Sequence, residues 1–214
     1  MLQFITHPKE GISILDEIRQ VVDGGCRWVQ LRMKDASREE IIETAKAAKE
    51  ICKEKECIFV IDDHVDIAKE LELDGVHLGK SDMSPIEARE ILGEEFIIGA
   101  TANTFEDIEG LRHLDIDYIG LGPFRFTTTK QKLSPVIGLE GYCEIMRKMK
   151  DASIRIPVVA IGGIEYDDIQ EIMNAGVSGV AVSGSIIKSG NIPETTGKMI
   201  DLLEKIVEER INNI

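Results

Sequence analysis

Three polar residues alternate with apolar ones in the segment VQLRMK, and their types suit the binding of an anion. Gln30, Arg32 and Lys34 are spaced two apart, so in a strand their side chains would all point to one side. An arginine and a lysine without partners cannot lie in a packed interior. Arginine offers a planar fork to phosphate oxygens and lysine a point charge. The spacing therefore indicates an anion site at a strand end; the alternative is a solvent-exposed strand end with a structural ion pair.

Carboxylates follow the next two apolar runs of the chain. Asp62 and Asp63 end the segment FVIDD, and Asp82 lies in GKSDM. Mg²⁺ prefers a few carboxylates, with waters and phosphate oxygens completing an octahedron. A metal-bound anion between these acids and the cations of VQLRMK would account for both sets of charges. Helix capping by Asp62, Asp63, Asp82 or Ser84 is the alternative, and it is compatible with metal binding.

The longest predicted loop covers residues 123–138 and contains a third polar group, Thr127, Thr128, Thr129 and Lys130. Hydroxyls and loop amides suit phosphate contacts, and a loop of this length in a compact domain is usually functional or mobile. The histidines point elsewhere: His77 has no second metal ligand at a useful spacing, and we interpret it as a hydrogen-bonded structural residue.

Short apolar runs alternate with amphipathic, charged stretches along the whole chain. The predicted strands are 2–6, 27–32, 57–62, 75–79, 96–101, 118–122, 157–162 and 179–184. The predicted helices are about 13–23, 38–54, 64–71, 85–92, 104–113, 139–150, 166–175 and 194–211. Within 38–54, apolar residues recur at helical spacing and Ser37 is placed to cap the helix.

Strict alternation of strand and helix predicts a parallel sheet, and eight such units favour closure into a single-domain (β/α)₈ TIM barrel over residues 1–214. An open, doubly wound sheet is the structural alternative. In a barrel, cations at the carboxyl end of a strand face the active site. Gly162 and Gly163 follow the seventh strand and Gly184 the eighth, where many barrels bind phosphate beside a short extra helix.

The formal net charge of −14 for 214 residues disfavours nucleic-acid or membrane-surface partners, although a local cluster of cations can still bind a small anion. The four cysteines form no C-x-x-C pair, so we expect free thiols in a reducing cytoplasm. The N-terminal segment MLQFITHPKEG does not resemble a signal peptide, and no apolar run is long enough for a membrane span. The sequence leaves open whether copies of the chain associate with one another.

Taken together, the motifs resemble the thiamine-phosphate synthase family over nearly the whole chain. The matching segments, in order, are VQLRMK (29–34), VIDDHVDIA (60–68), DGVHLGKSDM (74–83), IGATANT (98–104), DYIGLGPFRFTTTK (117–130), PVVAIGGI (157–164) and GVAVSGSI (179–186). The resemblance implies a transferase that joins hydroxymethylpyrimidine diphosphate to hydroxyethylthiazole phosphate, releasing pyrophosphate with Mg²⁺ as cofactor. These two phosphorylated small molecules are the partners we expect.

The resemblance also implies roles for individual residues. Those that would hold the pyrimidine diphosphate are Gln30, Arg32, Lys34, Asp62, Thr101 and Lys130. Those that would hold the thiazole phosphate are Thr127, Thr128, Thr129, Gly163, Ser183 and Gly184. Asp63 and Asp82 would bind Mg²⁺, and Arg32, Thr101 and Lys130 would act in catalysis by stabilising the leaving diphosphate.

The chain departs from the family pattern at several of these positions. The family usually has Asn at position 62 and Ser at 101 and 184, where this chain has Asp, Thr and Gly, and Arg125 adds a charge. The Asp at 62 adds a negative charge that must be offset near a diphosphate. Two other functions fit a related barrel, a thiazole tautomerase and a non-catalytic sensor of thiamine precursors. A tautomerase would not need Asp63, Asp82 and the surrounding cations together, which favours the synthase.

Overall fold

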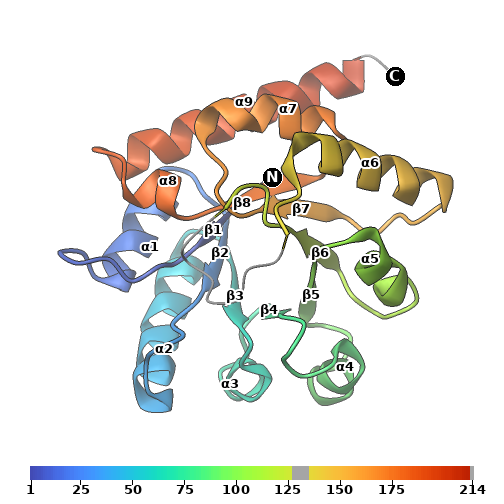
Figure 1. Cartoon of the computed structure of the whole chain (residues 1–214). Coiled ribbons are helices and arrows are strands. Elements are labelled where there is room, and N and C mark those ends of the chain that lie inside the picture. The colour runs from blue at the N-terminus through green and yellow to red at the C-terminus, as the bar shows by residue number, and fades with distance from the viewer. Residues whose placement is uncertain (127–134, 213–214) are drawn as a thin grey trace.

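The strands form a closed parallel barrel that is surrounded by helices (Figure 1). The computed structural model describes residues 1–126 and 135–212. The strands are β1 (Leu2–Ile5), β2 (Trp28–Leu31), β3 (Ile58–Asp62), β4 (Gly75–Leu78), β5 (Ile97–Ala102), β6 (Tyr118–Leu121), β7 (Val158–Ile161) and β8 (Gly179–Val182). Each strand pairs in parallel with the next, and β8 pairs with β1. This closure confirms the predicted barrel and excludes the open sheet.

The helices follow the strands in the predicted alternation. They are α1 (Ile14–Asp23), α2 (Arg38–Glu54), α3 (Val65–Glu70), α4 (Pro85–Leu92), α5 (Phe105–Leu111), α6 (Gly138–Asp151), η1 (Tyr166–Asp168), α7 (Ile169–Asn174), α8 (Gly184–Ile187) and α9 (Ile192–Asn212). The short helix α8, directly after β8, is the extra helix that we expected at the phosphate-binding corner of the barrel.

Serine and threonine side chains mark where several helices begin. Ser13, Ser37, Ser84 and Thr104 each accept a hydrogen bond from a backbone N–H in the first turn of α1, α2, α4 and α5. In α2, Glu40 also accepts a hydrogen bond from the backbone of Ser37, which completes a capping box. Each such cap stabilises its helix by about 1 kcal/mol. The predicted cap at Ser37 is therefore confirmed.

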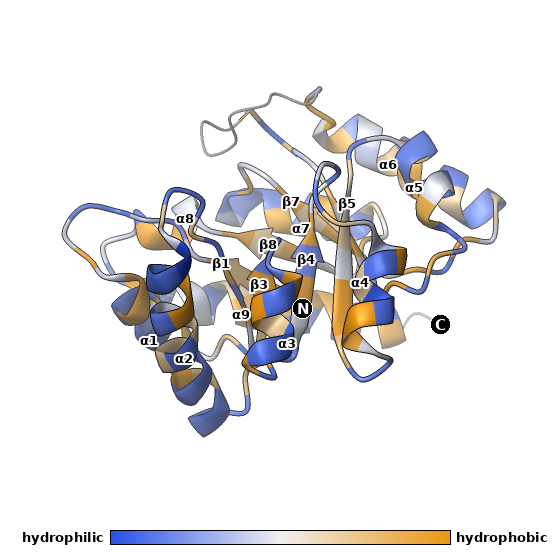
Figure 2. Cartoon of the chain, turned by 90° about the horizontal axis from the view of Figure 1, so that it is seen from below, coloured by the Kyte–Doolittle hydropathy of each residue, from blue (hydrophilic) through white to orange (hydrophobic). Residues whose placement is uncertain are grey.

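The core consists of two layers that the barrel wall separates. The larger layer lies between strands and helices, and the helices turn their polar faces outward (Figure 2). The smaller layer fills the barrel with Ile5, Trp28, Tyr118, Val159 and Ala181. Side chains alternate along each strand, so the residues two positions beyond these interior ones point toward the open end of the barrel. The interior packing thus leads directly to the site.

Glycines inside the barrel make room for two polar rings. A Cβ on Gly99 would lie 2.2 Å from the ring of Tyr118, and one on Gly120 would lie 2.7 Å from the ring of His77. Tyr118 also packs edge-on against Trp28, with the ring centroids 4.7 Å apart. The small residues of β5 and β6 therefore allow a tyrosine and a histidine to lie side by side in the interior.

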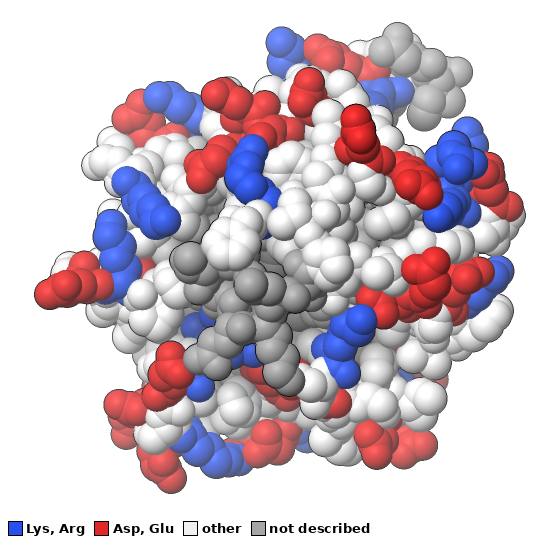
Figure 3. Space-filling view, in the orientation of Figure 1, with Lys and Arg blue, Asp and Glu red and all other residues white. Residues whose placement is uncertain are grey.

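Charged side chains of both signs are interspersed over the face seen in Figure 3, which shows no extended surface of one sign. Among the helices of residues 1–126 and 135–212, none combines the length and the apolar character needed to cross a membrane.

Candidate functional site

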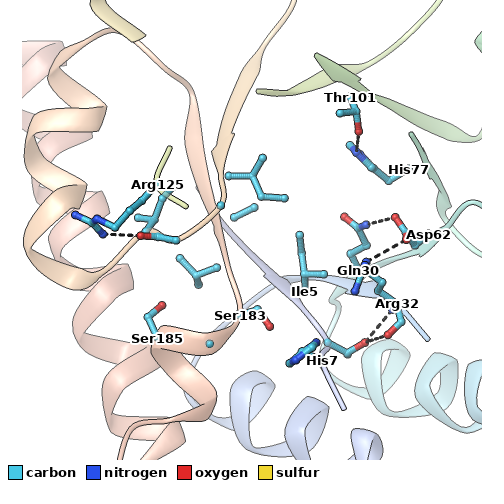
Figure 4. A pocket seen from close by; sticks show the side chains of 18 of the residues that line it. Ile5, His7, Gln30, Arg32, Asp62, His77, Thr101, Arg125, Ser183 and Ser185 are labelled. Carbon is cyan, nitrogen blue, oxygen red and sulfur yellow. Dashed lines mark hydrogen bonds and ion pairs between the residues drawn. The ribbon is translucent and has the colours of Figure 1, made fainter. Parts of the chain in front are cut away.

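A cavity of about 410 Å³ opens at the carboxyl ends of the barrel strands. Side chains from nearly every part of the ring reach it (Figure 4). Of the residues predicted for the site, those that line it are Gln30, Arg32, Lys34, Asp62, Asp63, Thr101, Gly163, Ser183 and Gly184. Residues more than one hundred positions apart in the sequence therefore meet in one place, as closure of the barrel requires.

The end of β2 forms the positive side of the cavity, and Asp62 lies against it. Gln30 donates from Nε2 to Asp62 Oδ1 over 2.8 Å. Asp62 Oδ2 lies 3.5 Å from Arg32 Nε and 3.9 Å from Lys34 Nζ. The backbone N–H of Arg32 donates to Thr6 Oγ1 over 2.8 Å, which ties the end of β2 to β1. The negative charge of Asp62, which seemed out of place beside a diphosphate, is thus offset by an amide donor and two cations.

Asp63 and Asp82 form a separate carboxylate pair. Lys34 Nζ lies 3.4 Å from Asp63 Oδ2, and Asp82 Oδ2 accepts a hydrogen bond of 2.7 Å from Gly79 N. Burial and the hydrogen bond with Asp82 raise the pKa of Asp63 to about 7, and that same bond holds the pKa of Asp82 below its usual value. The two neighbouring carboxyl groups thus differ in how readily each gives up its proton.

The carboxylates at this edge are not used as helix caps. Helix α4 is capped by Ser84, which together with Glu87 forms a capping box. Helix α3 begins after His64 and has no side-chain cap. Of the capping alternatives, only the one at Ser84 is borne out among the described residues. Asp63 and Asp82 remain available for a ligand.

The chemistry of the carboxylate pair is compatible with a magnesium ion, which prefers oxygen ligands. No group of three or more His, Cys, Asp or Glu side chains suited to a metal occurs in residues 1–126 and 135–212. Mg²⁺ commonly takes one or two carboxylates and fills its remaining positions with water and substrate phosphate oxygens. A cation between Asp63 and Asp82 would stabilise the charged form of both carboxyl groups.

A chain of hydrogen bonds runs from the cavity into the barrel. His77 Nε2 is 2.9 Å from Thr101 Oγ1, and His77 Nδ1 is 2.9 Å from the hydroxyl of Tyr118. Gln3 donates from Nε2 to that hydroxyl over 3.2 Å. The interpretation of His77 as a hydrogen-bonded structural residue is thus supported, but His77 also lines the cavity and orients Thr101 (Figure 4).

The opposite side of the cavity is built from the ends of β7 and β8. Gly162 and Gly163 have φ angles of 98° and 70°, which are strained for residues with a side chain. Ser183 and Ser185 each bury a hydroxyl oxygen that has no hydrogen-bond partner among the described residues. Backbone amides and hydroxyls without partners are suited to phosphate oxygens. This corner therefore has the character of a second anion site.

Arg125 fixes the loop that carries this second corner. Its guanidinium donates to both carboxylate oxygens of Asp168, over 2.9 and 2.8 Å, and to the carbonyl of Gly163 over 2.6 Å. The backbone N–H of Arg125 also donates to the carbonyl of Gly162 over 2.9 Å. Arg125, one of the residues that depart from the family pattern, thus holds the two glycines in place.

The predicted site and the residues that line the cavity do not match completely. Asp82 contacts Gly79, which lines the cavity, but is not itself a lining residue. Thr127, Thr128, Thr129 and Lys130 are not among the described residues, so their roles stay predictions. Polar lining residues that were not predicted include His7, His77, Arg125, Glu165, Ser185 and Lys188. The alternation of side chains along β4 could have indicated that His77 is near the site, because His77 lies two residues after Gly75 and on the same side of the strand. No local signal marks Lys188.

Comparison with known proteins adds to this geometry. Residues 2–186 match the family described as thiamine monophosphate synthase. The chain belongs to this family. The thiamine-phosphate synthase of Bacteroides fragilis is 56% identical over 201 residues, which cover 94% of this chain and 98% of that protein. The corresponding enzyme of Methanosarcina barkeri is 36% identical over 207 residues, covering 95% and 91%.

The fold agrees with a solved structure of the same kind. Thiamine phosphate pyrophosphorylase from Pyrococcus furiosus superposes with a TM-score of 0.84 at 32% identity, and the alignment covers 96% of each chain. The predicted resemblance to the thiamine monophosphate synthase family is confirmed. The cavity described above is therefore the candidate active site of a member of this family.

Proposed function

We propose that this chain is a transferase that makes thiamine phosphate. It joins hydroxymethylpyrimidine diphosphate to hydroxyethylthiazole phosphate and releases pyrophosphate. Membership of the thiamine monophosphate synthase family supports the reaction. The observation that carries the proposal is that Arg32, Lys34 and Asp63 line one cavity, with Asp82 hydrogen-bonded to Asp63 beside it. Such a combination suits a metal-bound diphosphate.

The proposed reaction is dissociative. The bond between the methylene carbon of the pyrimidine and the diphosphate oxygen breaks, and its electron pair leaves with pyrophosphate. The electron-rich aminopyrimidine stabilises the cation on the methylene carbon. The thiazole nitrogen then donates its lone pair to that carbon and forms the new C–N bond. No side-chain nucleophile is required, so the protein acts by orienting the two substrates and by stabilising charge.

The chain's own residues divide this work between two sides of the cavity. Gln30, Arg32 and Lys34 at the end of β2 bind the diphosphate, and Thr101, oriented by His77, adds a hydroxyl contact. Asp63 and Asp82 would hold Mg²⁺, which when bound supplies positive charge to the leaving diphosphate. The amides and hydroxyls at the ends of β7 and β8 bind the thiazole phosphate, at Gly163, Ser183 and Gly184.

The proposal includes a setting for the reaction. Residues 1–214 would act as one barrel domain in the cytoplasm, with the two phosphorylated precursors as partners and with no nucleic acid or membrane involved. The net charge of −14 supports the absence of such partners, because it repels polyanionic surfaces.

The test is reconstitution with purified protein. Protein incubated with both phosphorylated precursors and Mg²⁺ should release pyrophosphate and form thiamine phosphate in equal amounts, measured by a coupled phosphate assay and by chromatography. Chelation of Mg²⁺ should stop the reaction, and adding excess Mg²⁺ should restore it. Folded protein that binds the precursors but makes no product would refute the synthase and favour a sensor. Conversion of one thiazole tautomer into another, with no coupling, would favour a tautomerase.

A further inference from the structure

Lys188 lies at the edge of the cavity, at the end of the short helix α8. Its backbone N–H donates to the carbonyl of Gly184 over 2.9 Å, so the two residues are one helical turn apart on the same face. A Cβ on Gly184 would lie 3.7 Å from both Cε and Nζ of Lys188. The lysine side chain therefore extends back over the glycine, and its ammonium lies beside the proposed thiazole-phosphate corner.

We infer that Lys188 is an additional anion-binding residue, which binds the phosphate of the thiazole substrate and so helps to select a phosphorylated thiazole. The inference rests on the proposed function in one respect, because that function identifies the bound phosphate as the phosphate of the thiazole substrate. The position of the cation over Gly184, beside hydroxyls that have no partner within the described residues, is independent of that function.

The charge of Lys188 is not used elsewhere in the described part of the chain. Among residues 1–126 and 135–212, the structure gives its ammonium no ion pair with Asp or Glu and no hydrogen bond. Lys34, the cation across the cavity, is instead paired with Asp62 and Asp63. Lys188 lines the cavity, and a lysine there whose charge is not paired within the described residues is well placed to bind an anionic ligand.

A histidine and two serines lie near Lys188 in the described part of the chain, and Glu165 lines the same cavity from the loop after β7. His7 faces both Lys188 and Arg32, and burial together with these two cations lowers its pKa. Ser183 and Ser185 bury hydroxyl oxygens that have no hydrogen-bond partner among the described residues, and Figure 4 shows both side chains next to the cavity. Two hydroxyls and an ammonium around one glycine can together satisfy the oxygens of one phosphate.

The helix end that carries Lys188 is held in place from two sides. Lys9 donates from Nζ to the carbonyl of Ile187 over 2.9 Å, which ties the loop after β1 to α8. Ser189 donates from Oγ to the carbonyl of Ile186 over 2.7 Å. Because these bonds fix the backbone around Lys188, the side chain begins from a fixed point at the rim of the cavity.

The location distinguishes the two phosphates of the reaction. Gln30, Arg32 and Lys34 lie at the end of β2, next to the carboxylates of β3 and β4. Lys188 follows β8, and β1 separates β8 from β2. The variant Lys188→Ala should therefore affect the monophosphate substrate and spare the diphosphate substrate.

Steady-state kinetics with each substrate varied in turn tests this inference. Lys188→Ala should raise KM for the thiazole phosphate about tenfold, which corresponds to about 1.4 kcal/mol. It should leave kcat at saturation and KM for the pyrimidine diphosphate within about twofold of the wild type. Lys188→Arg, which keeps the charge, should retain most of the affinity. Lys205→Ala removes an exposed lysine of α9 and should change nothing.

Two outcomes would overturn the inference, and a binding experiment separates it from the proposed function. An unchanged KM for the thiazole phosphate in Lys188→Ala would show that the lysine does not bind it. A rise in KM for the pyrimidine diphosphate alone would assign Lys188 to the other phosphate. If the wild type forms no product, the proposed function fails. Calorimetric titration of wild type and Lys188→Ala with thiazole phosphate then still tests the lysine, and equal affinities would refute its role.

Discussion

Replacement of Asp82 by alanine separates a metal ligand from a structural residue. The side chain makes two contacts that the change would remove. Its Oδ2 accepts a hydrogen bond of 2.7 Å from Gly79 N, and it hydrogen-bonds to Asp63. Helix α4 keeps its own cap, because that cap is Ser84. Asp82→Ala therefore removes a carboxylate from the edge of the cavity without changing the start of the following helix.

The expected effects on stability and activity differ greatly in size. The loss of these two partly exposed hydrogen bonds costs about 1–2 kcal/mol of the free energy of unfolding. Part of that loss is offset, because a neighbouring acid no longer raises the pKa of Asp63. A metal that stabilises developing charge contributes several kcal/mol to the transition state, and about 1.4 kcal/mol corresponds to a factor of ten in rate. We therefore expect kcat/KM to fall at least about a hundredfold.

The assay measures kcat/KM over a series of Mg²⁺ concentrations, together with urea unfolding of the same preparation. A lost ligand should shift the Mg²⁺ dependence to higher concentration as well as lower the rate. Asp66→Ala is the matched control, because it removes an exposed aspartate from α3 that pairs with Arg38. The reasoning is refuted if Asp82→Ala lowers the free energy of unfolding by more than about 3 kcal/mol while activity per folded molecule stays near that of the control.

Three further changes test other parts of the molecule. Asp62→Asn should lower KM for the pyrimidine diphosphate severalfold, because Arg32 would no longer be shared with a carboxylate; steady-state kinetics measures it. Glu17→Gln should raise the free energy of unfolding at about pH 8 by up to about 3 kcal/mol and change it little near pH 5. The reason is that burial raises the pKa of Glu17 to about 7. Urea unfolding at both pH values measures the difference. Gly99→Ala should cost about 3 kcal/mol, because its Cβ would lie 2.2 Å from the ring of Tyr118; thermal unfolding measures it.

The sign of the Glu17 prediction follows from proton binding. The folded chain keeps the proton of Glu17 up to about pH 7, whereas the unfolded chain loses it near the ordinary value of 4.5. The free energy of unfolding of the wild type should therefore decrease as the pH rises through this window. The stability contributed by the protonated acid is present below the unfolded pKa and is lost as the pH rises through the folded one. Equal stability of wild type and variant at about pH 8 would contradict the raised pKa.

The other two predictions have equally clear contrary results. A higher KM for the pyrimidine diphosphate in Asp62→Asn would mean that the carboxylate orients Arg32 rather than competing with the substrate. An unchanged melting temperature of Gly99→Ala would mean that Tyr118 can move aside, and that the close fit of the ring does not determine the interior packing.

The barrel could be predicted from the sequence because its signals are local. Each strand is a short apolar run, and several helices begin with a capping residue, as α2 does with Ser37 followed by Glu40. The two-residue period of Gln30, Arg32 and Lys34 was enough to predict one side of a strand end, and all three line the cavity. Closure followed from the number of strand–helix units, because eight of them match the known barrel.

The features that could not be predicted depend on contacts between distant parts of the chain. Lys9 and Ile187 are 178 positions apart and meet because β1 pairs with β8. The role of Arg125 depends on Asp168 and Gly163, which lie on the next loop around the ring. Nothing near these residues in the sequence specifies their partners, since the partners are set by the register of the closed sheet. A pattern-based interpretation therefore finds the strand ends but not the links between loops.

Asp62 and Asp63 show how two adjacent acids acquire different surroundings. Asp62 ends β3 with its side chain toward the cavity, where Gln30 and the cations of β2 meet it. Asp63 has a φ angle of 67°, so the backbone turns at that residue and directs its carboxyl group toward Asp82. One acid thus joins the positive side of the cavity and the next joins the carboxylate pair. Under the proposed function, the extra charge at position 62 moderates the β2 cations and leaves the metal to Asp63 and Asp82. Asp62→Asn should therefore strengthen diphosphate binding, with a smaller effect on the Mg²⁺ dependence than that of Asp82→Ala.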